Sequence, residues 1–319
     1  MHLTHGFPFD PSYGYRLEDL LELQPPPEPA DFATFWQARY QRALAVDANP
    51  RLRPADVSDP RMRVHELEYS STAGFAIRGW LLTPLGGPPR RGFILGHGYG
   101  GLDRPPLDLP RDDAAYLIPC VRGLCRSRCP PIPEDPDGHV VYGIEHRDSY
   151  LVGGCVEDLW TGASALLGLF PELTGHLGYL GTSLGGGLGA LALAWDARIG
   201  RGHLNVPGFG HQPLRLALPT VGSAAALQRL AQTRAQGPLL DTLAYFDSAL
   251  AARHIRQPML VAAAGFDPAV APPGQFAVYN AIPGDKRLCL LTAGHFDYPG
   301  RRAEEQRLMA QLWAFFAPL

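Results

Sequence analysis

The sequence has no long apolar run and few charged residues, and its acidic and basic residues are nearly equal in number. None of its hydrophobic stretches approaches the roughly 20 residues that span a bilayer, and MHLTHGFPFD at the start lacks the basic and apolar regions of a secretory signal. Charged side chains make up 18% of the 319 residues, 28 basic against 31 acidic, which gives no electrostatic basis for binding nucleic acid or an anionic membrane. We expect a cytoplasmic protein whose partner is a small molecule.

Cysteine is also scarce. The five cysteines are Cys120, Cys125, Cys129, Cys155 and Cys289, an odd number that leaves at least one unpaired. The first three form a group without C-x-x-C spacing, and no second pair or histidine set follows at ligand spacing. We therefore predict reduced cysteines and no metal site, and we expect no organic cofactor.

Hydrophobic residues are abundant at 46%, which excludes a disordered chain and allows a large core. From residue 92 onward, short apolar runs alternate with longer amphipathic segments. The runs predicted as buried strands are GFILG, AAYLIPC, GHLGYLG, GHLNV, PMLVAAA and RLCLL. This alternation predicts one α/β domain over residues 1–319, with a mainly parallel central sheet flanked by helices. In such sheets, catalytic groups lie on loops beyond the carboxyl ends of the strands.

Three further segments surround this alternation. Residues 1–60 are predicted to form an N-terminal helical extension, with a helix in ADFATFWQARYQRALA that Asp31 caps. Residues 64–84 predict two strands that turn at Gly74. An insert at about 205–255 predicts helices that form a small cap beside the site.

Gly181-Thr182-Ser183-Leu184-Gly185 forms a G-x-S-x-G pattern between a strand-like run and a helix-like run. A nucleophile elbow needs this context, because its glycines permit a sharp turn that exposes the serine hydroxyl above the sheet. Ser183 is therefore the candidate nucleophile. The alternative interpretation is a glycine-rich turn between strand and helix without chemistry.

A serine hydroxyl needs a base to remove its proton and a carboxylate to orient that base. Asp267 follows PMLVAAA and His295 follows RLCLL, so the order is serine, acid, histidine, as in α/β hydrolases. Asp247, Asp285 and Asp297 are alternative acids, although Asp297 stands only two residues from His295. The following histidines are interpreted as packing or surface residues: His2, His5, His65, His139, His146, His176, His203, His211 and His254.

The oxyanion of the tetrahedral intermediate needs two N–H donors. The backbone N–H of Leu184 follows the nucleophile at a helix N-terminus. The loop HGYGG follows the early strand GFILG, and we assign the second donor to its Tyr99 amide. A simple glycine-rich turn is the alternative interpretation of this loop.

With these residues, the sequence resembles carbohydrate esterase family seven along nearly the whole chain. This family joins acetyl xylan esterases and cephalosporin C deacetylases. The similar segments are EPADFATFW, HGYGG, GTSLGGGLGALALA, DTLAYFDSALAARHI, GFDPAVAPPGQFAVYNAI and AGH. The resemblance implies an α/β-hydrolase fold, removal of acetyl groups from sugar hydroxyls or similar small alcohols, and a homo-oligomer.

The sequence departs from the family pattern at three places. Leu184 replaces the usual glutamine after the nucleophile, and Phe296 replaces the glutamate after the histidine. The RGQG signature is Arg122-Gly123 followed by leucine and cysteine, so its first two residues are kept. The resemblance implies that Arg122, Gly123 and Phe296 bind substrate or support the site, in surroundings less polar than the family's.

We therefore predict a serine ester hydrolase in which Ser183, Asp267 and His295 act as a catalytic triad through an acyl-enzyme. Two alternatives stay open: another acyl hydrolase, such as a peptidase or a lipase-like esterase, and a non-catalytic binding protein on the same fold. A peptidase is expected to carry a large extra domain, for which residues 1–60 leave no room. A binding protein is expected to lack part of the triad, whereas all three residues are present.

Overall fold

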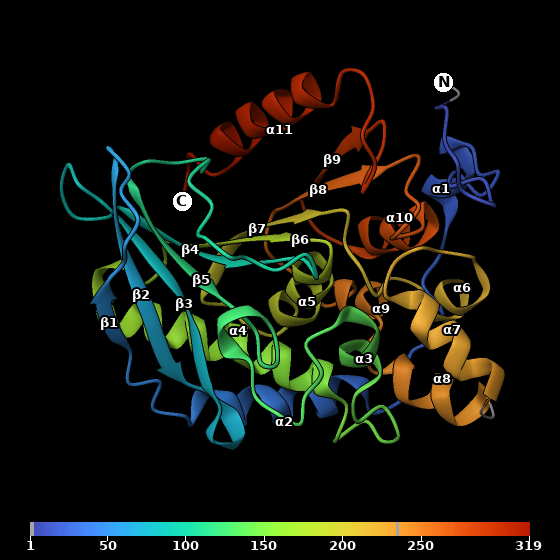
Figure 1. The fold of residues 1–319 in the computed structure, drawn as a ribbon, viewed down its shortest axis with the longest axis horizontal. Helices are drawn as coiled ribbons and strands as arrows, with labels where there is room; N and C mark the ends of the chain where they lie inside the picture. The colour runs from blue at the N-terminus through green and yellow to red at the C-terminus, as the bar shows by residue number, and fades with distance from the viewer. Residues whose placement is uncertain (1–2, 234–235) are drawn as a thin grey trace.

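The computed structural model describes residues 3–233 and 236–319. Nine strands of these residues form one sheet in the order β1-β2-β3-β5-β4-β6-β7-β8-β9 (Figure 1). The pairs from β1 through β3 to β5 are antiparallel, and those from β5 through β4 to β9 are parallel. The strands are β1 (Arg51–Pro54), β2 (Met62–Ser70), β3 (Ala76–Pro84), β4 (Arg91–Gly96), β5 (Ala114–Pro119), β6 (Leu177–Thr182), β7 (Ile199–Asn205), β8 (Met259–Ala264) and β9 (Lys286–Leu291). The predicted α/β architecture with a mainly parallel sheet is confirmed.

The apolar runs predicted from residue 92 onward are strands β4 to β9. Because successive side chains of a strand point to opposite faces, each run contributes to two cores. Ile94 and Leu117 pack in the core on one face, whereas Phe93 and Tyr116 pack in the core on the other. Burial on both faces explains why β5 and β8 are continuously apolar, whereas β9, at the edge of the sheet, exposes Leu290.

Helices cover both faces of the sheet (Figure 1). Helices α2, α4 and α5 contribute side chains to the core on one face, and α11 contributes to the core on the other. The helices are α1 (Leu17–Glu22), α2 (Phe32–Leu44), α3 (Pro136–Val141), α4 (Leu151–Leu169), α5 (Leu184–Leu193), α6 (Gln212–Ala217), α7 (Ala224–Thr233), α8 (Gln236–Ala244), α9 (Ser248–Ala252), α10 (Pro272–Ala281) and α11 (Arg301–Phe315). In the two described ranges, no helix has the length and apolar character needed to cross a bilayer.

The segment predicted as a helical extension holds α1 and α2, but also β1, which extends the antiparallel edge of the sheet. The buried Trp36 of α2 packs against Trp160 and Phe246. Asp31 stands at the N-cap position of α2, yet the prediction that its side chain caps the helix is wrong. Its carboxylate instead accepts hydrogen bonds from Arg147 and from the Tyr245 hydroxyl, and a charged donor competes well with a backbone N–H.

The insert at about 205–255 forms the helices α6 to α9, as the sequence predicts. The division of the chain into one domain with an extension and a cap stays a prediction.

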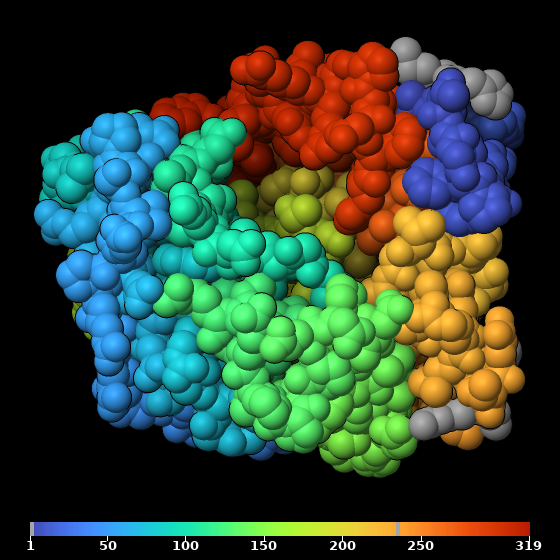
Figure 2. Space-filling view, in the orientation of Figure 1, coloured from blue at the N-terminus to red at the C-terminus, as the bar shows by residue number. Residues whose placement is uncertain are grey.

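The crossover from β4 to β5, residues 97–113, contains no helix, although parallel strands are usually joined by one. A hollow therefore lies between this loop and α11, with β6 and β7 at its floor (Figure 2). Thr182 lines this hollow, whereas its neighbour Ser183 faces a different cavity, described below.

Candidate active site

Ser183 lies at the sharp turn between β6 and α5 and has a strained backbone with a positive φ, at φ 56° and ψ −112°. Close backbone packing explains the flanking glycines. A Cβ on Gly185 would stand 2.2 Å from the Gly96 carbonyl oxygen, and one on Gly181 would stand 2.4 Å from the Gly185 carbonyl oxygen. The turn is fixed by backbone hydrogen bonds, in which the Ser183 N–H donates to Asn205 O at 2.9 Å.

The structure brings together the three side chains predicted as a triad. His295 Nε2 lies 2.9 Å from Ser183 Oγ. His295 Nδ1 lies 2.8 Å from Oδ2 and 3.1 Å from Oδ1 of Asp267. Ser183 follows β6, Asp267 follows β8 and His295 follows β9, so the carboxyl ends of three parallel strands place them at one edge of the sheet.

Asp267 is fully buried, and its acceptor positions are occupied. Oδ1 accepts the backbone N–H groups of Ala269 and Val270, both at 2.9 Å. Oδ2 accepts Nε2 of Gln275 at 2.9 Å, while Oε1 of Gln275 accepts the N–H of Ala264. These bonds hold the carboxylate in one orientation towards His295. Sequence reasoning missed Gln275, because a glutamine inside an apolar helix carries no signal of its partner.

The pKa of His295 is raised above its ordinary value. Burial alone lowers it, but the hydrogen bond to Asp267 and the negative charge of that carboxylate together outweigh the burial. The Asp267 contact also fixes the tautomer: Nδ1–H donates to the carboxylate, which leaves Nε2 free to accept a proton from Ser183 Oγ.

The three alternative acids lie elsewhere. Asp247 caps α9 and accepts the N–H groups of His211 and Gln212. Asp297 pairs with Arg301 at the surface. Asp285 lies in the turn before β9, where its carbonyl accepts the N–H of Met259.

The assignment of the backbone N–H groups of Leu184 and Tyr99 as oxyanion donors stays a prediction, and both groups are available for it. No acceptor within the described residues is hydrogen-bonded to the amide of Leu184 or of Tyr99. The loop that carries Tyr99 lies against the nucleophile, since a Cβ on Gly98 would stand 3.5 Å from Ser183 Cβ. The N–H of Gly185 donates to His97 O at 2.9 Å and fastens this loop to the start of α5.

The Tyr99 side chain is held by His139, which was predicted to be a packing or surface residue. The Tyr99 hydroxyl lies 3.1 Å from Nδ1 of the buried His139, whose Nε2 lies 3.0 Å from the Arg122 carbonyl oxygen. With the proton on Nε2, the imidazole donates to the carbonyl and accepts from the hydroxyl. His139 therefore connects the Arg122 segment to the loop over Ser183.

Arg122 and Gly123 lie behind the site and do not line the cavity at Ser183. The Arg122 guanidinium forms a buried ion pair with Asp158, with Nη2 to Oδ1 at 2.6 Å, and also donates to Ser71 and Thr72. Gly123 has φ +87°, and a Cβ there would stand 2.4 Å from Ile132. Of the two roles that the resemblance implies, this placement favours support of the site.

Phe296, next to His295, packs against Phe7 of the N-terminal segment and against Phe266, with ring centroids 6.0 and 5.1 Å away. The backbone of the same segment reaches the acid, since Pro11 O accepts the N–H of Asp267 at 3.0 Å. The N-terminal segment therefore covers the outer side of the histidine and acid loops.

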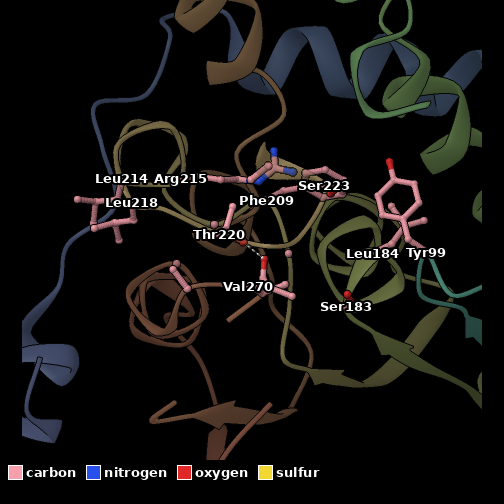
Figure 3. Close-up of a pocket in the computed structure, with 16 residues that line it drawn as sticks. Tyr99, Ser183, Leu184, Phe209, Leu214, Arg215, Leu218, Thr220, Ser223 and Val270 are labelled. Carbon is pink, nitrogen blue, oxygen red and sulfur yellow. Dashed lines mark hydrogen bonds between the residues drawn. The ribbon is translucent and has the colours of Figure 1, made fainter. Parts of the chain in front are cut away.

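A cavity of about 50 Å³ opens beside Ser183 (Figure 3). It is lined by Tyr99, Ser183, Leu184, Gly208, Phe209, Gly210, Leu214, Arg215, Leu218, Thr220, Ser223, Ala224, Ala269, Val270, Ala271 and Gly274. A buried water needs about 10–15 Å³ on this scale, so the cavity holds a group of only a few heavy atoms. Its walls come from the loops after β4, β6, β7 and β8 and from the insert predicted as a cap.

Among the described residues, one group has donors suited to a metal: the side-chain donor atoms of His97, Cys120 and Cys125 lie within 4.8 Å of one another. The sequence spacing did not indicate a histidine beside these cysteines. Both ring nitrogens of His97 already have partners, since Nδ1 faces Gly98 O and Nε2 accepts the N–H of Val121. We interpret the group as a buried polar cluster behind the loop of Tyr99.

A comparison with known families agrees with this geometry. The acetyl xylan esterase (AXE1) family model matches residues 15–311. The chain belongs to the acetyl xylan esterase family. The predicted family, the α/β-hydrolase fold and the class of serine ester hydrolase are thereby confirmed.

Solved structures of this family share the fold. An acetyl xylan esterase from Paenibacillus sp. R4 is 22% identical with a TM-score of 0.82, and the match covers 94% of this chain and 100% of that one. Acetyl xylan esterase 1 from Thermoanaerobacterium sp. JW/SL YS485 is also 22% identical, with a TM-score of 0.78 and coverage of 95% and 99%. The acylaminoacyl peptidase of Pyrococcus horikoshii, 13% identical with a TM-score of 0.62, is matched over 80% of this chain but only 41% of its own.

The buried pair behind the site yields a stability prediction. Asp158→Ala removes the partner of a buried guanidinium, and we expect the free energy of unfolding to fall by about 3–5 kcal/mol. Glu68→Ala breaks the exposed pair with Arg78 and should cost about 1 kcal/mol or less. Urea unfolding of both variants measures the difference, and equal losses would contradict the role assigned to Arg122.

The His295 contact yields a titration prediction. In Asp267→Asn the carboxylate charge is lost while burial remains, so we expect the pKa of His295 to fall below that of the wild type. NMR titration of the imidazole measures this shift. Asp297→Asn is the matched control, because Asp297 is nearer in sequence but faces Arg301, and it should change the pKa little. A larger shift in the control would make Asp297 the acid.

Proposed function

We propose that this protein removes acetyl groups from acetylated sugars or similar small alcohols, with Ser183, His295 and Asp267 as catalytic residues. The observation that carries the proposal is the continuous contact from Ser183 Oγ to His295 Nε2 and from His295 Nδ1 to Asp267, beside a small cavity. Membership of the acetyl xylan esterase family supports the same reaction.

In the first half of the reaction, His295 Nε2 takes the proton of Ser183 as the oxygen attacks the ester carbonyl carbon. Asp267 stabilises the imidazolium that forms. The developing oxyanion accepts hydrogen bonds from the N–H groups of Leu184 and Tyr99. His295 then donates its proton to the alcohol oxygen, which leaves with the bonding electrons, and the acyl group stays on Ser183.

In the second half, water enters in place of the alcohol, and His295 Nε2 removes a proton from it. The hydroxide adds to the acyl carbon, the same two N–H groups bind the second oxyanion, and Ser183 Oγ leaves and regains the proton. Acetate is released, and no step needs a metal or an organic cofactor.

The dimensions of the cavity favour a short acyl group. Leu184, Phe209 and Leu218 supply apolar walls, and the small volume of about 50 Å³ favours a short acyl group over a long hydrocarbon chain. A peptidase reaction is the second candidate function. The acylaminoacyl peptidase has a similar fold, but at 13% identity this similarity supports the fold and not the reaction.

A series of p-nitrophenyl esters from acetyl to octanoyl tests the proposal. We expect kcat/KM to be highest for acetyl or propionyl and to fall about tenfold or more by octanoyl, because longer chains do not fit. Ser183→Ala should lose about 10³-fold or more in kcat for every ester. Ser70→Ala, an exposed serine of β2, is the control and should behave as the wild type. A preference for octanoyl, or full activity in Ser183→Ala, would refute the proposal.

The homo-oligomer implied by the family resemblance, like the cytoplasmic location, stays a prediction. Large apolar side chains on the surface are compatible with subunit contacts, among them Leu21, Val221, Leu290 and Trp313. Light scattering after gel filtration measures the assembly, and a mass of a single chain at all concentrations would contradict it.

A further inference from the structure

Arg215, in α6, is the one charged residue among those that line the cavity at Ser183. Every other lining residue is apolar, glycine or an uncharged hydroxyl residue. The guanidinium extends towards Phe209 and Ser223 (Figure 3), and part of the residue remains exposed. The space that receives the substrate therefore carries a single positive charge.

Arg215 differs from the other enclosed arginines in having no carboxylate partner. Arg39 pairs with Glu157, Arg91 with Asp113, Arg122 with Asp158, and Arg198 with Asp196, each within 3.2 Å. No carboxylate of a described residue lies within 4.0 Å of the Arg215 guanidinium. Its contacts are one hydrogen bond from Nη1 to Oε1 of Gln212 at 3.3 Å and the face of the Phe209 ring, with Cζ 4.8 Å from the centroid.

The polar groups near Arg215 are already engaged with other partners. Asp247 accepts the backbone N–H groups of His211, Gln212 and Ala249. The hydroxyl of Tyr99 lies against His139, and the hydroxyl of Tyr150 donates to a carbonyl oxygen. The negative charge of Asp247 stabilises the guanidinium in part, but no carboxylate of a described residue forms an ion pair or a hydrogen bond with Arg215.

An enclosed guanidinium without an ion-pair partner is unusual, because burial disfavours its charged form and lowers its pKa. Arginine nevertheless stays protonated in proteins, and its planar fork of five N–H donors matches a carboxylate with two parallel hydrogen bonds. A carboxylate that enters the cavity would supply both the missing ion-pair partner and the missing acceptors.

We propose that Arg215 binds a carboxylate of the ester substrate, so that the enzyme prefers acidic esters to neutral esters of the same size. The inference rests on the proposed function, because it assigns the cavity at Ser183 to the substrate. The carboxylate can belong to the acyl part or to the alcohol part of the ester, and the chemistry of recognition is the same.

The test compares esters that differ only by a carboxylate in place of a carboxamide. Monomethyl succinate and methyl succinamate place the group on the acyl part, whereas 4-acetoxybenzoate and 4-acetoxybenzamide place it on the alcohol part. For the wild type at pH 8, we expect a tenfold or greater ratio of kcat/KM, charged over neutral, in at least one pair. That pair identifies which part of the substrate faces Arg215.

The variants then assign this ratio to the guanidinium. Arg215→Gln should reduce the ratio at least tenfold, and Arg215→Lys should restore part of it, since lysine keeps the charge but loses the fork. Arg201→Gln is the matched control, because Arg201 also stacks on a phenylalanine ring, with Cζ 5.1 Å from the Phe315 centroid, but does not line the cavity. It should keep the wild-type ratio.

A wild-type ratio near or below one in both pairs would overturn the inference, as would a ratio that survives in Arg215→Gln. If Arg215→Gln does not fold, inhibition of the wild type tests the proposal instead. Succinate should inhibit hydrolysis of p-nitrophenyl acetate at least tenfold more strongly than succinamide. Equal inhibition by the two compounds would contradict the proposal. Neutral esters cleaved equally by wild type and Ser183→Ala would refute the proposed function itself. Ser183-dependent cleavage without any acidic preference refutes only the role of Arg215.

Discussion

The close contact between the backbones of β4, β6 and α5 is the constraint on which the site depends. Gly185 lies so near the Gly96 carbonyl that no side chain fits between them, and this proximity turns the chain sharply at Ser183. A non-glycine residue with positive φ costs about 1–3 kcal/mol and persists only where its surroundings enforce it. The N–H of Ser183 donates to Asn205 O, and its carbonyl accepts the N–H groups of Gly187 and Gly208, so three backbone contacts hold the strained residue.

Buried charges organise the layers around this turn. Asp267 orients His295, and Asp158 holds Arg122, whose carbonyl fixes His139 and thereby the Tyr99 side chain. A buried ion pair contributes little net stability, but removing one partner leaves an isolated charge at high cost. Such pairs therefore act here as positioning devices, and they make the Tyr99 loop dependent on residues far behind the cavity.

The departures from the family pattern make the site less polar near the nucleophile. The Leu184 side chain is buried and lines the cavity, and Phe296 packs into an aromatic group with Phe7 and Phe266. Against these apolar walls, Arg215 supplies one strongly directional polar group. One fork of donors is enough to bind a carboxylate, so this cavity suits an ester that carries one.

The amino-acid sequence by itself predicted the alternation of strands and helices from residue 92 onward and the three side chains that meet at Ser183. Strand and helix periodicities are local, and each triad residue directly follows a strand-like run, so topology alone predicts their meeting at one edge of the sheet. The tertiary structure decided which partners the polar side chains have. Asp31 binds Arg147, and Gln275 donates a hydrogen bond to Asp267. His97 lies beside two cysteines, and Arg215 has no carboxylate as an ion-pair partner among the described residues. These features join segments distant in the chain, and a polar side chain's partner depends on how those segments pack, which no local pattern encodes.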